Sequence, residues 1–159
     1  MASSLLLLTW LAACGTDPAR MDAVAYQGAM GPILQKNRAL AQELLETASE
    51  VKKGTVDGPA VATRVRQRVI PAADSLKADV AAVKPATPEL AAAHATLVKA
   101  WTARAEAWHA IGDAYEKGDL AALEAARARD LASKDDEAAW VTAAGAALGA
   151  QGLRIELYP

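Results

Sequence analysis

Residues 88–117, PELAAAHATLVKAWTARAEAWHAIGDAYEK, decide the fold of this chain. The large side chains in this stretch are separated alternately by four and three residues, which is the heptad pattern of a helix that packs along its length against other helices. Thr87-Pro88 is typical of a helix start, and Gly118-Asp119 of a helix end followed by a new N-cap. We therefore predict one long helix here, with a buried seam made of Leu90, His94, Leu97, Trp101, Arg104, Trp108, Ile111 and Tyr115.

Apolar residues at helical spacing also precede this stretch. Asp17-Pro18 predicts a helix start, because an aspartate side chain can cap a helix and proline fits its first turn. Gly31-Pro32 then predicts either a kink or a short separate helix, followed by a main helix from Pro32 to Lys53. The residues expected on the buried face are Tyr26, Met30, Ile33, Leu40, Leu44, Ala48 and Val51.

Two more helices complete the expected set. Residues 54–59 are rich in turn-forming types and precede a helix that Pro71 should bend. The last helix follows the cap at Asp119. The second helix is expected to bury Val61, Val65, Val69, Ala72, Leu76, Val80 and Val83, and the fourth to bury Leu120, Leu123, Leu131, Ala138, Val141 and Leu148, with Trp140 near this seam.

Short turns between long helices make neighbouring helices antiparallel. We therefore predict an all-α fold, an up-down-up-down antiparallel four-helix bundle over residues 18–150. The chain is rich in alanine and contains no phenylalanine, and alanine has the highest helix propensity. Leu153, Ile155 and Leu157 alternate in residues 151–159 and predict an extended tail. We expect this tail to fold back on the bundle; an edge offered to a partner strand is the alternative.

The charge pattern argues against nucleic-acid binding. The formal net charge is −2, whereas a nucleic-acid footprint needs a clustered basic face. Arg64, Arg66 and Arg68 form the densest basic cluster, but residues two apart point to different sides of a helix. We expect a solvated stretch there and no nucleic-acid partner.

The N-terminal segment carries a separate signal. Leu5 to Leu11 form a short apolar run, followed by Ala12-Ala13 and then by Cys14, the only cysteine in the chain. The run is too short to span a bilayer, which takes about 20 apolar residues. Leu11-Ala12-Ala13-Cys14 resembles the lipobox of bacterial lipoproteins, at which signal peptidase II cuts.

This resemblance implies a signal peptide over residues 1–13 and a lipidated Cys14. Residues 14–17 would then be a short tether to a membrane, held by acyl chains, of which two or more give stable anchoring. Gly15, rather than an aspartate, follows the cysteine, which favours the outer membrane, facing the periplasm. Residues 1–11 contain no Lys or Arg, so the usual positive start of a signal peptide is missing.

Glu106 and His109 are weak candidates for a metal site. The motif Glu-x-x-His places both side chains on one face of a helix, and ferritin-like di-iron bundles carry it on two helices. This chain has one copy, and His94 is not preceded by a matching glutamate. We expect Glu106 and His109 to be surface residues, with no metal bound.

His94 falls in the predicted seam, where a buried imidazole needs a hydrogen-bond partner. Tyr26 lies at a similar height if the first and third helices are parallel, and we expect a core histidine satisfied in this way. The alternative is a haem ligand, with Met30 as the second ligand in the manner of cytochrome b562-like bundles. That family places its ligand histidine near the end of the last helix, where this chain has none.

Arg104 lies in the same seam between two tryptophans and needs a carboxylate there. Its height along the bundle predicts an ion pair with Asp130 that fixes the register of the helices. The other polar residues at or near seam positions are Asn37, Arg127 and Lys134. They predict a wet middle layer, either a solvated stretch or a ligand pocket.

No combination of residues predicts catalysis. The mature chain would contain no thiol, and no serine has a recognisable base. We therefore predict a non-catalytic envelope lipoprotein without a cofactor, acting as an interaction or structural module with a protein partner. The alternative is a periplasmic bundle that binds a small ligand, a metal or haem. The weak apolar face of the fourth helix also leaves room for a second copy.

Overall fold

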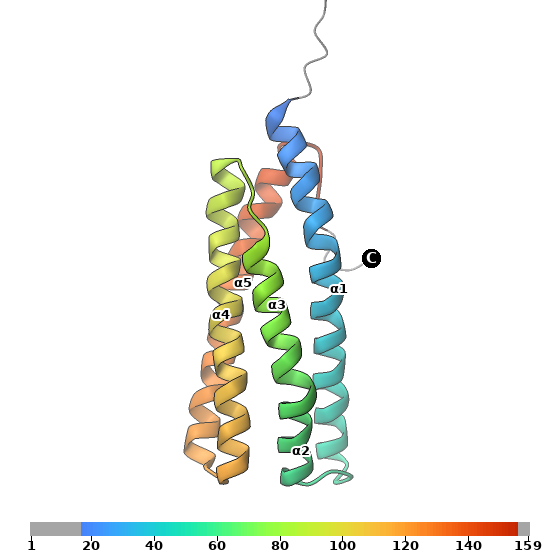
Figure 1. The fold of residues 1–159 in the computed structure, drawn as a ribbon, viewed down its shortest axis with the longest axis vertical. Helices are drawn as coiled ribbons and strands as arrows, with labels where there is room; N and C mark the ends of the chain where they lie inside the picture. The colour runs from blue at the N-terminus through green and yellow to red at the C-terminus, as the bar shows by residue number, and fades with distance from the viewer. Residues whose placement is uncertain (1–16, 156–159) are drawn as a thin grey trace, which may run out of the picture.

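The computed structural model describes residues 17–155 and shows four antiparallel helical rods (Figure 1). The chain runs along the bundle, returns, and repeats this course, so the predicted up-down-up-down bundle is confirmed. No strand occurs within the described residues. The first rod is helix α1 (Pro18–Lys52); the second consists of α2 (Gly58–Arg64), the π-helical turn η1 (Val65–Val69) and α3 (Ile70–Ala82); the third is α4 (Pro88–Lys117) and the fourth α5 (Leu120–Gly149).

Aspartate side chains cap three of the helices. Asp17 accepts from the backbone N–H of the second helical residue at 3.0 Å, and Asp57 and Asp119 cap α2 and α5, each at 2.9 Å. Thr87 is different: it occupies the N-cap position of α4, but its side chain does not cap the helix. Its hydroxyl instead donates to Asp22 of α1 at 2.7 Å. The threonine cap predicted from sequence is therefore replaced by a bond that ties the α3–α4 loop to α1.

The two helix-interior prolines have different effects. Helix α1 continues through Pro32 without a break, so the short separate helix is wrong, although Figure 1 shows the N-terminal part of α1 leaning across the end of the bundle. Before Pro71 the chain widens into η1, where the Ile70 N–H bonds to the carbonyl of Val65, five residues back. A proline has no N–H, and its ring crowds the carbonyl four residues earlier. The bend expected at Pro71 therefore takes the form of a π-helical turn.

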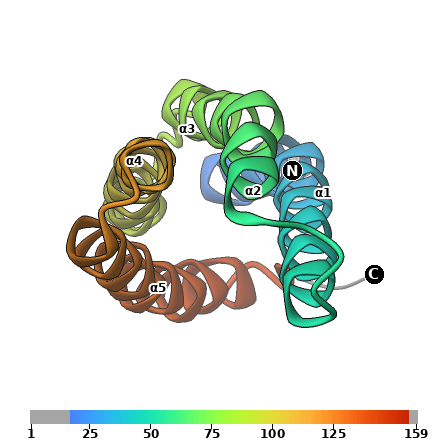
Figure 2. The same ribbon diagram turned by 90° about the horizontal axis from the view of Figure 1, so that it is seen from below.

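The helices pack unequally around the bundle. Helix α4 contacts α5 most extensively and also packs on α3, whereas α1 packs mainly on α3. The backbones of α1 and α5 do not pack closely against each other. Figure 2 shows the start of α5 beside α4 and apart from the end of α1. The fourth side of the bundle, between α1 and α5, is therefore the least closely packed.

The predicted seam of α4 is confirmed, with Trp108 and Tyr115 half-buried and its other members buried. The seam predicted for α5 is wrong in part, because Leu120 and Leu131 are 74% and 64% exposed and Ala138 is also exposed. On α1, the predicted Ala48 and Val51 are exposed as well. The physical reason on α5 is that polar side chains occupy its inward positions. The buried residues of α5 are Leu123, Ala126, Ser133, Trp140, Ala144 and Leu148.

The tail folds back on the bundle as far as residue 155. Leu153 and Ile155 pack against the core, and Gln27 of α1 donates to the Arg154 carbonyl at 2.7 Å. Arg20 donates to the Gln151 carbonyl at 2.9 Å. The predictions for residues 1–16, which include the signal peptide and Cys14, and for Leu157 concern residues outside the described part of the chain. Within 17–155, no helix combines the length and apolar character needed to cross a membrane.

Candidate functional site

One chain of buried hydrogen bonds joins all four rods. Trp140 Nε1 of α5 donates to the Tyr26 hydroxyl of α1 at 2.8 Å, and that hydroxyl lies 3.0 Å from His94 Nδ1 of α4. His94 Nε2 lies 2.8 Å from the Val80 carbonyl of α3. A carbonyl only accepts, so Nε2 carries the proton and Nδ1 accepts from Tyr26. The prediction of a core histidine paired with Tyr26 is confirmed.

Burial favours the uncharged forms of His94 and Tyr26, the two titratable members of this series of hydrogen bonds. Desolvation lowers the pKa of His94 below its usual 6.5, although the Val80 carbonyl opposes the shift. Desolvation also raises the pKa of Tyr26 to about 12, against the effect of the Trp140 bond. Both ring nitrogens of His94 are engaged by protein groups, so neither is presented to a haem iron. This series of hydrogen bonds therefore has the geometry of a structural contact that holds the four rods together.

Arg104 organises a second polar group, nearer the other end of the bundle. Its Nε lies 3.7 Å from an Asp130 carboxylate oxygen, and its Nη2 lies 2.8 Å from Glu137. The Ser133 hydroxyl accepts from Nε at 3.2 Å, and the guanidinium lies 4.7 Å from the centre of the Trp101 ring. The predicted Arg104–Asp130 pair is confirmed, while Glu137 and Ser133 are partners that sequence reasoning missed. We call Arg104, Asp130, Ser133 and Glu137 the charged layer.

The charged layer is buried unevenly. The Arg104 side chain is 8% exposed, whereas those of Asp130 and Glu137 are 21% and 23% exposed. Desolvation raises the pKa of Asp130, and the positive charge of Arg104 opposes this shift. Asn37 of α1 donates to Glu137 at 3.3 Å and so links the first rod to this layer. The carboxylates thus point inward toward Arg104 instead of into solvent.

A groove of about 600 Å³ runs between α1 and α5 beside the charged layer. Trp101 and Trp108 of α4 lie along it, together with Arg104. This volume is within the range typical of ligand sites, roughly 300–1,000 Å³. The predicted wet middle layer is therefore a groove, to which Asn37 and Lys134 contribute. The walls are formed on α1 by Leu34, Arg38, Leu40, Ala41, Leu44 and Leu45, and on α5 by Asp130, Lys134, Glu137, Ala138 and Val141.

Apolar side chains remain uncovered along this groove. Leu45 is 71% exposed on the α1 wall, and Leu131 is 64% exposed one turn before Lys134 on α5. Arg127, which was also expected in the polar layer, instead donates to the Tyr115 hydroxyl at 2.7 Å. The α1 wall of the groove therefore carries a leucine that the bundle does not bury, whereas Leu131 is exposed on α5 outside the groove lining.

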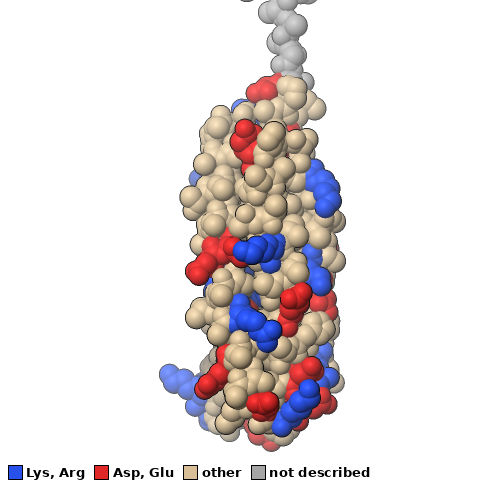
Figure 3. Space-filling model, turned by 90° about the vertical axis from the view of Figure 1, so that its left-hand side faces the viewer, with Lys and Arg blue, Asp and Glu red and all other residues tan. Residues whose placement is uncertain are grey.

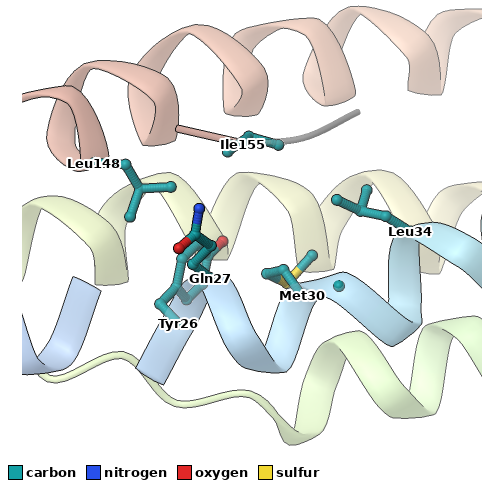
Figure 4. Close-up of a pocket in the computed structure, with 7 residues that line it drawn as sticks. Tyr26, Gln27, Met30, Leu34, Leu148 and Ile155 are labelled. Atoms are coloured by element: carbon teal, nitrogen blue, oxygen red, sulfur yellow. The ribbon is translucent and has the colours of Figure 1, made fainter. Parts of the chain in front are cut away.

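A smaller cavity of about 330 Å³ lies farther along the same side of the bundle, toward the tail (Figure 4). Tyr26 and Met30 of α1 line it with Leu148 of α5, and Ile155 of the tail lies opposite α1. Leu34 lines both this cavity and the groove. The tail therefore covers one end of the α1–α5 side, and the groove occupies the rest.

The metal candidates do not form a cluster. Glu106 and His109 are both exposed, and His109 Nε2 bonds to Asp74 of α3 at 3.0 Å. Within residues 17–155, no group of three His, Cys, Asp or Glu side chains is placed to hold a metal ion. Glu106 and His109 are the surface residues that the sequence predicted.

Positive charges on the surface are matched by acidic neighbours. Arg64 lies 2.6 Å from Glu50, Arg68 lies 3.3 Å from Glu43, and Arg66 pairs with Glu116. The three arginines of α2 and η1 thus pair with acidic residues of α1 and α4 instead of forming a basic patch. Figure 3 shows acidic and basic residues interspersed on one face of the bundle.

Compared with known proteins, the chain matches no family model, no curated protein and no solved structure. Its function is therefore argued from the groove and from the N-terminal sequence.

Proposed function

We propose that this protein is a non-catalytic, lipid-anchored component of the bacterial cell envelope that holds a protein partner in the α1–α5 groove. The observation that supports this most is Leu45, an uncovered leucine that is 71% exposed on the α1 wall of the groove. Contiguous exposed apolar surface marks interaction sites. Full burial of one leucine side chain contributes about 1.5–3 kcal/mol, so a partner that covers Leu45 gains affinity.

The anchor would set the orientation of the bundle. Helix α1 begins at Pro18, so residues 15–17 are all that separate it from a lipidated Cys14. Three extended residues reach only about 10 Å. The end of the bundle that carries the start of α1 would then lie at the membrane. The far end of α1, where Leu45 lines the groove, would face the periplasm.

A non-catalytic role agrees with the chemistry of the groove. Ser133 is the hydroxyl nearest to the charged groups, and it donates to the Asp130 carbonyl at 2.6 Å while it accepts from Arg104. A nucleophilic serine needs an adjacent base to accept its proton. In this arrangement the proton of Ser133 is held by a backbone carbonyl, and no side chain is placed to remove it.

A small-molecule ligand is the second candidate, favoured by the volume of the groove and by its two tryptophans. Native mass spectrometry of the intact protein, purified from its own bacterium, separates the two candidates. A stoichiometric small molecule that stays bound would favour this second function over protein docking.

A pair of neighbouring positions tests the docking proposal. Ala138 and Ala139 are both exposed, but only Ala138 lines the groove. A photoreactive residue at position 138 of the full-length protein, in living cells, should crosslink to one discrete protein. The same residue at position 139 should not. Equal crosslinking from both positions, or none from 138, would contradict docking in the groove.

The anchor is tested separately. Cells fed an alkyne-tagged palmitate should label the wild-type protein, and Cys14→Ala should abolish both the label and the membrane association. Wild-type protein that takes up no label would remove the lipoprotein part of the proposal.

A further inference from the structure

We propose that the cavity beneath the C-terminal tail binds a small apolar molecule with one or two aromatic rings. This site is separate from the α1–α5 groove, although Leu34 lines both, and it goes beyond the docking function. It is supported by the size of the cavity, by the chemistry of its lining and by the way the tail covers it.

The cavity is large for a space between packed helices. Its volume is about 330 Å³, whereas protein interiors contain few voids larger than a water molecule. Two residues of its lining, Tyr26 and Met30, are nevertheless each 2% exposed. An apolar cavity of about 150 Å³ already binds benzene. The cavity therefore has room for a ligand of one or two rings.

The lining favours an apolar ligand over ordered water. A buried water needs roughly two to four polar partners, but the polar groups here are already paired. The Tyr26 hydroxyl lies between Trp140 Nε1 and His94 Nδ1, and Gln27 Nε2 donates to the Arg154 carbonyl. Across residues 17–155, every buried side-chain nitrogen and oxygen has a hydrogen-bond partner. The rest of the lining is Met30, Gly31, Leu34, Leu148 and Ile155.

Met30 and Tyr26 favour an aromatic ligand in particular. A methionine sulfur makes favourable contacts with aromatic rings, and its unbranched side chain adapts to the outline of a ligand. Aromatic rings also pack on one another in offset and edge-to-face arrangements. Figure 4 shows Tyr26 and Met30 on α1, with Ile155 of the tail opposite them. A ring that enters between α1 and the tail therefore meets both side chains.

The tail provides the way in. Arg20 donates to the Gln151 carbonyl at 2.9 Å and Gln27 to the Arg154 carbonyl at 2.7 Å, and both bonds are exposed. Gly152, in the turn after α5, has a φ of +72°, a left-handed conformation that favours glycine. Exposed hydrogen bonds are typical of segments that open at low cost in free energy. The tail is therefore the part of the cavity wall that opens to admit a ligand.

Indole is the probe, and methionine methyl groups report where it binds. The full-length protein, with isotope-labelled methionine methyl groups, is placed in zwitterionic nanodiscs and titrated with indole by NMR. The ring current of bound indole should shift the Met30 methyl resonance in a saturable way. Met21 is 57% exposed and does not line the cavity, so its resonance should not move. No saturable shift of Met30, or equal shifts of both methionines, would overturn the proposal.

Two glycines of α1 offer a matched pair of variants. Gly31 lines the cavity, whereas Gly28 is exposed and does not. Beyond the adjoining residues and the helix backbone, no atom lies within 4 Å of the place that a Cβ would take at either position. Gly31→Phe should fill the cavity and weaken indole binding at least about tenfold, equivalent to 1.4 kcal/mol. Gly28→Phe should leave the affinity unchanged.

A smaller side chain and a second ligand sharpen this test. Gly31→Leu adds less bulk and should also weaken indole binding relative to Gly28→Leu. Equal affinities within both matched pairs would mean that indole does not enter the cavity. Octanol has as many non-hydrogen atoms as indole but no ring, so it should displace indole only at about tenfold higher concentration, because it lacks the contacts with Met30 and Tyr26. Displacement at equal concentration would reject the aromatic class of ligand.

The docking function is tested independently of this cavity. A crosslink from position 138 reports on the groove, so loss of indole binding rejects the cavity site alone. A small molecule that native mass spectrometry finds on the wild-type protein and on Gly28→Phe, but not on Gly31→Phe, would lie in the cavity and would support this inference.

Discussion

The two ends of the bundle are held together by different chemistry. At one end, Tyr26, His94 and Trp140 form a neutral hydrogen-bond chain with Val80 that reaches all four rods. At the other end, Arg104 of α4 pairs with the carboxylates of Asp130 and Glu137 on α5. Asn37 of α1 donates a hydrogen bond to Glu137. The neutral end is closed and the charged end borders an open groove. The two halves of one small fold thus differ both in the chemistry that holds them together and in how completely they are closed.

Two tryptophans measure this difference most directly. Trp140 is 1% exposed in the closed half, and Trp140→Ala should cost about 3–5 kcal/mol of the free energy of unfolding. Trp108 is half-buried beside the groove, and Trp108→Ala should cost less than half of that. Urea unfolding followed by circular dichroism checks both values. Equal losses would mean that the two halves are equally cohesive.

Removal of Arg104 should have a smaller but clear effect. Arg104→Met leaves Asp130 and Glu137 without their cation, and both carboxylates retain about a fifth of their exposure. Breaking a fully buried pair costs about 3–5 kcal/mol, and residual solvation should reduce this to about 1–3 kcal/mol. Adding Asp130→Asn and Glu137→Gln should recover part of the loss in the same urea experiment. If the triple variant is less stable than Arg104→Met, the loss of stability in Arg104→Met does not come from unpaired carboxylates.

The closed half should also make stability depend on pH. The pKa of His94 is lowered in the folded state, chiefly by desolvation, so the unfolded state binds a proton more readily. The contribution of His94 to the free energy of unfolding is complete above pH 6.5. It is lost as the pH falls from 6.5 toward the pKa of His94 in the folded state. Urea midpoints measured between pH 7.5 and 4.5 should decrease through this window. His94→Leu should reduce the dependence of the urea midpoint on pH, whatever its effect on stability at pH 7.5.

The smallest effect on stability is expected at the edges of the groove. Leu45→Ser and Leu131→Ser change exposed residues, so each should shift the free energy of unfolding by no more than about 0.5 kcal/mol. Leu45→Ser, which changes a residue of the groove lining, should also weaken the crosslink formed from position 138 in cells. A loss of stability above 1 kcal/mol, measured by urea unfolding, would mean that these leucines belong to the core.

The fold could be predicted from the sequence because the local signals agree with one another. Asp17-Pro18, residues 54–59 and Gly118-Asp119 mark turns and caps through backbone chemistry that needs no tertiary information. The seam of α4 was also accessible, since its heptads carry large apolar side chains over the full length of the helix. The Tyr26–His94 and Arg104–Asp130 pairs followed from height along the bundle alone.

The α5 seam and the groove could not be predicted from the sequence in the same way. Periodicity favours leucine and disfavours charge, so it predicts Leu131 in the core and does not predict Ser133 and Glu137 there, while Asp130 is predicted only through its height relative to Arg104. These polar residues face inward because Arg104 on another helix satisfies them, and a single-helix pattern does not contain that information. The separation of α1 from α5 likewise depends on how four rods pack together, not on the repeat within any one of them.

The contacts of the tail have a consequence for the order in which the chain folds. Arg20 bonds to the carbonyl of Gln151 across 131 residues of sequence, so the start of α1 is secured by residues that follow α5. Contacts of such separation form late, because a long loop must close first. Residues around Arg20 should therefore be the last to gain protection from amide hydrogen exchange during refolding.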